Sequence, residues 1–308
     1  MSLHWTTGRP SAHRKRWVAA LVGLTLMTTT GCSIGNEAGS AYLVDGGSVS
    51  DASVQHDSSV FTQENVTTTP TDVETASFNR AQITFAVRHA LIAKALAAKG
   101  IVITDAELAA AQAQVTAPGA DPNLPLQVGL PKAKEADVLH DAVALDELVK
   151  ALPAAGAPVS DVAVTAEGVP AASRAEAVSL RSHFIADPGS MDAAVAAAGP
   201  TNGVPKKVYR LLQTPAVGTA GLYQPSTGAV VIVPGSSGYL VLRTSGRSVI
   251  STNLTPAAFS SLAGLSSLFN VGALLLAPYQ GAAGISVNPR YGLWDPASLQ
   301  VVPGNDGL

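Results

Sequence analysis

The chain has few charged residues, few aromatic residues and a single cysteine. Of its 308 residues, 13% are Asp, Glu, Lys or Arg and 5% are aromatic, whereas 47% are hydrophobic. The formal net charge is only −3, so the sequence has no polybasic footprint and we expect no nucleic-acid partner. The hydrophobic content favours a folded protein, because enough apolar surface is available to offset the entropy lost on folding. The length allows two domains.

Sequence signatures of several enzyme classes are also absent. No Ser stands three residues before a Lys, so the nucleophile pair of penicillin-binding enzymes is missing. No G-x-S-x-G motif or phosphate-binding glycine loop occurs. Beyond the N-terminal segment the histidines have no metal-ligand spacing, so we expect neither a metal nor a cofactor; they are His56, His89, His140 and His183.

The N-terminus has the layout of a secretion signal. Residues 1–31 contain four basic residues and no acidic one. An apolar segment, Trp17–Met27, follows the basic residues, but it is too short to span a bilayer, which takes about 20 residues. A basic stretch, a short apolar core and small residues together predict export from the cytoplasm.

The small residues before Cys32 resemble the bacterial lipobox, in which a Gly-Cys pair marks cleavage and the thiol is lipidated. The Leu usual three places before the cysteine is Thr29 here, so an ordinary cleaved signal or an uncleaved anchor are the alternatives. A free thiol in an exported protein would be prone to oxidation, whereas an acylated Cys32 would not. We therefore predict a lipoprotein signal peptide over 1–31, a tether over 32–40, and a lipid anchor on the extracytoplasmic face of the cell membrane.

Residues 41–152 are predicted to form a mainly helical domain. The longest helix is expected over 76–99, where a wide apolar stripe indicates a core helix covered by several partners. The segment 62–72, with its Thr run and Pro70, is expected to be a loop. The other expected elements are a strand over 41–45, a helix capped by Ser50 or Asp51, a helix begun by the Thr104–Glu107 capping box, and a helix over 132–152.

The second half changes to alternating apolar residues. Residues 159–168 read as a strand, and Ser173 and Glu176 form a capping box that begins a helix. Two apolar segments within 226–245, joined by a Gly/Ser turn, predict a hairpin. We assign 157–250 to a small α/β domain and 255–308 to a C-terminal helix and strand. The expected class is therefore α+β.

The order of the N-terminal motifs resembles the SurA/PrsA-type extracytoplasmic foldases. The stretch "AYLVDGGSVSDASV" is followed by "AVRHALIAKALAAKGIVITDAELAAA". The tail "GISVNPRYGLWDP" is similar to the ending of actinobacterial members. The resemblance implies that 41–152 is a SurA N-terminal-like domain and that the tail returns to pair with the strand over 41–45. A generic helical domain is the alternative.

The second domain resembles a parvulin-type prolyl isomerase, from its order of strand, helix, helix, glycine loop and hairpin. In that family a histidine usually follows the aromatic residue of the last strand, but here Leu240 follows Tyr239. The first strand, "SDVAVTA", contains no histidine either. The resemblance therefore implies a degenerate domain, and no catalytic residue is assigned. Three tail residues are expected either to lock the tail or to line a peptide groove: Arg290, Tyr291 and Trp294.

Three functions remain open from the sequence. The first is a lipid-anchored chaperone-like protein that binds unfolded or extended exported polypeptides in an apolar groove, without covalent chemistry. The second is an active prolyl isomerase with a nonstandard site. The third is a passive envelope adaptor for one folded partner.

Overall fold

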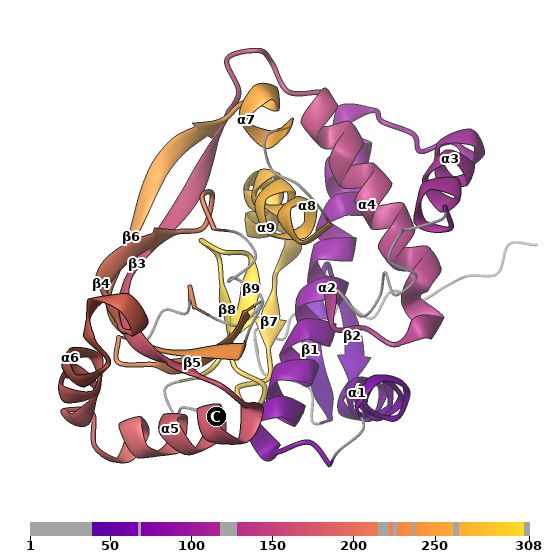
Figure 1. The fold of residues 1–308 in the computed structure, drawn as a ribbon. Coiled ribbons are helices and arrows are strands. Elements are labelled where there is room, and N and C mark those ends of the chain that lie inside the picture. The colour runs from indigo at the N-terminus through magenta and orange to yellow at the C-terminus, as the bar shows by residue number, and fades with distance from the viewer. Residues whose placement is uncertain are drawn as a thin grey trace, which may run out of the picture. The chain divides into compact units, whose positions relative to one another are not determined.

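The computed structural model describes residues 39–66, 69–117, 128–214, 222–223, 227–235, 238–260 and 265–304. These residues form helices and antiparallel sheets, which confirms the α+β class (Figure 1). The signal peptide, Cys32 and most of the tether lie outside the described residues. Among the helices that are described, none is both long enough and apolar enough to cross a membrane.

The N-terminal part begins with a hairpin of β1 (Ser40–Val44) and β2 (Gly47–Ser50). Asp45 and Gly46 connect the strands with φ of 54° and 76°. Positive φ at both turn positions suits Asp-Gly and matches the twist of a hairpin. Ser50 then caps α1 (Asp51–Asn65), as the sequence predicted.

The boundaries of α1 and α2 (Asp72–Lys99) differ from the prediction, which placed a loop over 62–72. Helix α1 continues to Asn65 because Phe61 is buried against Phe78 of α2, with ring centroids 4.8 Å apart. Helix α2 starts before Ala76 because Thr71 and Glu74 form a reciprocal capping box, which was not predicted.

Two further helices complete the N-terminal part. Thr104 and Glu107 form the expected capping box at the start of α3 (Asp105–Val115). The short 3₁₀ helix η2 (Lys132–Lys134) leads into α4 (Glu135–Lys150), which packs against α2 (Figure 1). The apolar stripe of α4 faces the core, with Val138 and Leu145 fully buried.

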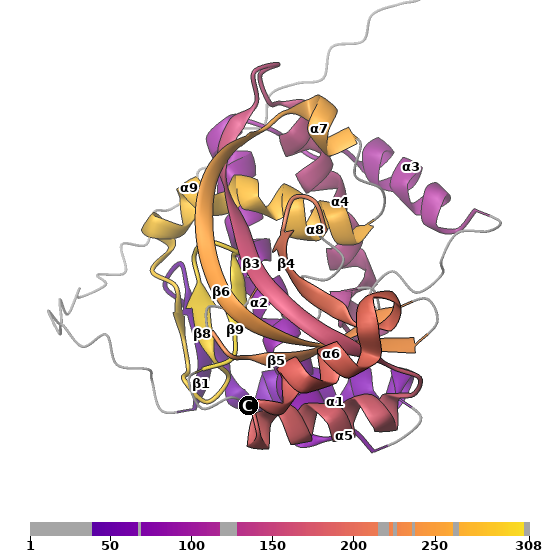
Figure 2. The same ribbon diagram turned by 60° about the vertical axis from the view of Figure 1, so that its left-hand side comes forward.

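The second half is built on a four-stranded antiparallel sheet with the order β4-β3-β6-β5. Its strands are β3 (Ala157–Ala171), β4 (Val204–Arg210), β5 (Val230–Gly235) and β6 (Gly238–Leu254). Figure 2 shows β3 and β6 side by side, and they pair from Ala157 opposite Leu254 to Ala171 opposite Tyr239. The predicted hairpin is present, but β6 runs on to Leu254. The edge strand β4 was not predicted, since its residues are mostly exposed and do not alternate.

The two faces of this sheet contact different cores. Helices α5 (Arg174–Ala186) and α6 (Ser190–Asn202) cover a small core that includes Phe184, Met191 and Val241 (Figure 2). Leu242, next to Val241 on β6, belongs instead to the main core. Because neighbouring residues of a strand point to opposite faces, the sheet separates the two clusters.

The C-terminal part supplies short helices and three short strands. The segment 255–308 was expected to contain one helix, but its described residues form α7 (Pro256–Ser260), α8 (Leu265–Val271) and the 3₁₀ helix η4 (Gly272–Leu276). The elements α9 (Ala277–Gln280), η5 (Gly281–Ala283), β7 (Ser286–Val287), β8 (Leu293–Asp295) and β9 (Gln300–Val302) follow. Strand β7 pairs with β1, so the tail joins the N-terminal sheet as expected.

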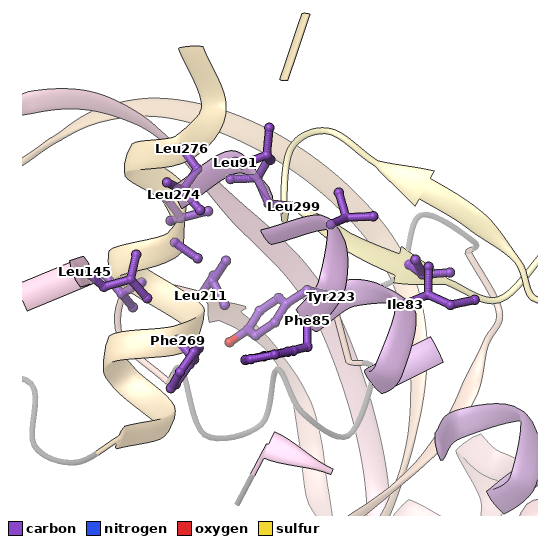
Figure 3. Packing of buried hydrophobic residues seen from close by; sticks show 14 of the residues in the cluster. Ile83, Phe85, Leu91, Leu145, Leu211, Tyr223, Phe269, Leu274, Leu276 and Leu299 are labelled. Carbon is purple, nitrogen blue, oxygen red and sulfur yellow. The ribbon is translucent and has the colours of Figure 1, made fainter. Parts of the chain in front are cut away.

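The main core joins residues from all three parts of the chain. Figure 3 shows Phe85 and Leu91 of α2 near Leu145, Phe269 and Leu274. Leu211 and Tyr223, from the second half, and Leu299, from the tail, belong to the same cluster. The helical part is therefore completed by segments distant in sequence.

Candidate functional site

Tyr239 and Leu240, which were compared with the last strand of parvulins, lie on β6 and contact apolar neighbours. Leu240 is partly buried against the main core, whereas Tyr239 packs against the small core that α5 and α6 cover. Leu240 pairs with Pro170 on one side and with Val233 on the other. An aliphatic side chain in this place offers no group for acid–base chemistry.

The tail residues tie the C-terminal segment to the start of the chain. Arg290 donates from Nη1 to Oδ2 of Asp51 over 2.8 Å, and its guanidinium lies 4.9 Å from the ring centroid of the buried Tyr291. Trp294 donates from Nε1 to Oε1 of Gln280 over 3.1 Å. These contacts are structural in kind, and none of the three tail residues lines the pocket described next.

A pocket of about 120 Å³ lies between β2, α1, α2 and the start of α4. Typical small-molecule sites measure about 300–1,000 Å³, so this one has room for a single side chain of a partner. Its lining consists of Val49, Ser53, Val54, Asp57, Gln82, Phe85, Ala86, His89, Lys134 and Asp137.

Helical spacing explains how α2 contributes to the pocket. Gln82, Phe85, Ala86 and His89 are three, four and seven residues apart and so share one helix face. Phe85 and Ala86 supply apolar surface, and Gln82 is held by a hydrogen bond from Nε2 to the carbonyl of Gly129 over 2.9 Å.

The pocket also has charged groups from α1, η2 and α4. Nζ of Lys134 lies 3.9 Å from Oδ2 of Asp57 and 4.0 Å from Oδ2 of Asp137. These long ion pairs are partly exposed and hold the side chains only weakly. A partner could therefore combine an apolar contact inside with polar contacts around it.

A histidine cluster adjoins the pocket where α2 meets α4. His89 of α2 lines the pocket, and its Nδ1 lies 2.8 Å from Oδ1 of Asp141 on α4. Nδ1 of His140 lies 3.3 Å from the same oxygen. The ring centroids of His89 and His140 are 6.2 Å apart, and those of Phe85 and His89 are 6.1 Å apart.

Burial divides the cluster into an inner carboxylate and two outer imidazoles. The Asp141 side chain is 0% exposed, whereas His89 and His140 are 46% and 38% exposed. The hydrogen bond to Asp141 raises the pKa of His89, and burial opposes that rise. The buried carboxylate of Asp141 thus stabilises positive charge on the partly exposed His89.

Sequence spacing did not reveal this cluster, because His89 and His140 come from different helices. One signal was available: Asp141 lies three residues after Val138 and four before Leu145, on the apolar face of α4. A carboxylate in that register is expected to be buried, and a buried carboxylate needs a partner. Its partner could not be identified before α2 was placed beside α4.

Comparisons with known proteins add no identity to these observations. No protein-family model matches the chain, and no curated protein matches it significantly.

Proposed function

We propose that this protein is a membrane-anchored, extracytoplasmic chaperone-like lipoprotein that binds unfolded or extended exported polypeptides without isomerase catalysis. The observation that carries the proposal is the small apolar pocket with charged groups between α1, α2 and α4. The volume of this pocket suits one apolar side chain of an extended polypeptide. A site that accepts one apolar side chain can bind many different polypeptides, as the proposed function requires.

The arrangement of the two halves supports the same proposal. A mainly helical part whose hairpin pairs with the returning tail is what the resemblance to SurA/PrsA-type foldases implies. The order of strand β3, helices α5 and α6 and hairpin β5–β6 is what the resemblance to parvulins implies. Leu240 at the usual histidine position favours binding over catalysis.

The first test measures polypeptide binding by fluorescence anisotropy, with the full-length chain in detergent and a labelled, permanently unfolded protein. We expect saturable binding in the micromolar range. Ser53 lines the pocket from α1, so Ser53→Trp should fill it and weaken binding roughly tenfold or more, because burial of a large apolar side chain contributes about 1.5–3 kcal/mol.

Ser59→Trp is the matched control for that test, because Ser59 is exposed on the same helix and does not line the pocket. It should bind like the wild type. Equal binding by the two variants would refute the pocket as the binding site, and no binding by the wild type would refute the chaperone function. Acceleration of Xaa-Pro isomerisation that is lost on Tyr239→Ala would favour the isomerase instead.

The lipid anchor is tested separately by replacing Cys32. We expect Cys32→Ala to move the protein from the membrane fraction to the soluble fraction. Its mass should also lack the acyl chains, each of which contributes about 0.8 kcal/mol of membrane binding per buried CH₂. Membrane fractionation and intact-mass spectrometry check this; unchanged retention and unchanged acylation would show that Cys32 is not the anchor.

A further inference from the structure

We propose that His89, His140 and Asp141 form a binding site for a divalent first-row transition metal, for which Zn²⁺ is the appropriate probe. The three residues each offer one ligand atom, and these atoms all lie within 4.8 Å of one another. This inference does not depend on polypeptide binding, since the cluster lies on α2 and α4 beside the pocket.

The distances between the ligand atoms are close to those of a metal centre. Zinc binds histidine nitrogen at about 2.0–2.1 Å and carboxylate oxygen at about 2.0–2.2 Å, so tetrahedral ligand atoms lie about 3.4 Å apart. Oδ1 of Asp141 lies 2.8 Å from Nδ1 of His89 and 3.3 Å from Nδ1 of His140. Small side-chain rotations of the two partly exposed imidazoles can therefore place three ligands around one ion.

The buried carboxylate provides the second, independent reason for a cation. Asp141 is fully buried, and among the described residues its Oδ2 atom has no hydrogen-bond partner. A buried ionised carboxylate is costly unless a cation or several hydrogen bonds compensate for it. Both imidazoles contact Oδ1, which leaves Oδ2 without a partner among the described residues, whereas a divalent ion would compensate the carboxylate and engage all three side chains.

The surroundings of the cluster also favour positive charge. Asp57 and Asp137 line the adjoining pocket, and the ammonium of Lys134 lies near both carboxylates. Among these named groups, the carboxylates of Asp57, Asp137 and the buried Asp141 outnumber the ammonium of Lys134. The net negative potential should attract a cation to the cluster.

The ligand types select the class of metal. Two imidazoles with one carboxylate suit zinc and its first-row neighbours, whereas calcium and magnesium prefer oxygen ligands alone. Three protein ligands leave one position for water or for a group from a partner, as in open zinc sites. Both helices hold their ligands in the packed part of the fold, since α2 and α4 contact each other along the core.

Metal binding can be measured directly on the full-length protein. After treatment with a chelator, the protein is titrated with Zn²⁺ by isothermal calorimetry and with Co²⁺ by visible absorption. We expect one ion per chain, a tetrahedral Co²⁺ spectrum, and a rise in melting temperature with Zn²⁺, because a ligand that binds only the folded state stabilises it.

His140→Ala and His56→Ala form a matched pair of variants. His140 is a proposed ligand with a partly exposed side chain, and His56 is exposed on α1 outside the cluster. The loss of an outer-shell partner weakens metal binding roughly 10–100-fold. His140→Ala removes a proposed ligand and should weaken Zn²⁺ binding by more than this, whereas His56→Ala should not change it. Asp141→Asn, with its fold checked by circular dichroism, should also abolish the tetrahedral Co²⁺ spectrum.

Two results would overturn the site. One is the absence of saturable binding at one ion per chain in the wild type. The other is an equal loss of affinity in His140→Ala and His56→Ala, which would show that Zn²⁺ binds to surface histidines in general. Because none of these measurements uses a polypeptide, failure of the metal site and failure of the proposed function can be told apart.

Discussion

A chain that lacks residues 284–308 is expected to lose the folded structure of its N-terminal helices. The deletion removes β7, which pairs with β1, and it removes Leu299 and Val301, which are buried against the helical part. It also removes the backbone N–H of Val301 that donates to Oγ1 of Thr84 on α2 over 2.9 Å. The tail is thus part of the N-terminal fold, although it is the last segment of the chain.

Arg88 makes the expected effect large. Its side chain is buried, and its guanidinium donates to the carbonyl oxygens of Leu299 over 2.7 Å, Phe269 over 2.8 Å and Ser298 over 3.2 Å. Burial lowers the pKa of Arg88 to about 9, which reflects the cost of holding this charge away from water. Loss of the tail removes the acceptors Leu299 and Ser298, and each buried donor left unpaired costs about 1–3 kcal/mol.

Thermal unfolding followed by circular dichroism checks this prediction. The truncated chain should show no cooperative transition for its helices, and Arg88→Met should lower the free energy of unfolding in the otherwise complete chain. Arg290→Ala is the control, since it removes a half-exposed ion pair with Asp51 and should change stability by at most about 1 kcal/mol. A melting curve of the truncated chain that matches the wild type would refute the role of the tail.

Local sequence rules predicted the elements that local interactions determine. Ser50, Thr104 and Ser173 were recognised as helix caps because a cap needs only the residues of one helical turn. The pairing of the tail with β1 was expected from a resemblance and is present. Alternation of apolar residues revealed β3 but not β4, since the edge strand is exposed on most of its length.

The candidate site was the least predictable part because it depends on contacts between distant helices. His89 and Asp141 are far apart in sequence, and their contact exists only because α2 packs on α4. The tail residues Arg290 and Trp294 were expected either to lock the tail or to line a groove, and in the structure they bond to Asp51 and Gln280. Unusual residues in a tail can thus be explained by the bonds that hold the tail against the rest of the fold.

Asp161→Ala is expected to cost the most stability among single changes in the second half. Asp161 on β3 is fully buried, and Oδ2 accepts from Nε of Arg210 over 2.7 Å and from Nη2 over 2.6 Å. Oδ1 accepts from the backbone N–H of Leu212 over 3.1 Å. One carboxylate therefore fastens β3 to the end of β4 and to the residues that follow it.

Removing one partner of a buried ion pair costs about 3–5 kcal/mol, and we expect a value near the lower end, about 3 kcal/mol, because the Arg210 side chain is 33% exposed and water can solvate part of it. Urea unfolding should show a lower midpoint with an unchanged slope. Asp192→Ala is the matched control: Asp192 also pairs with an arginine, Arg243, but it is 69% exposed, so its loss should cost less than about 1 kcal/mol. Equal losses in the two variants would mean that the pair of Asp161 with Arg210 is no stronger than a surface ion pair, and that β4 is held by the backbone bonds of the sheet alone.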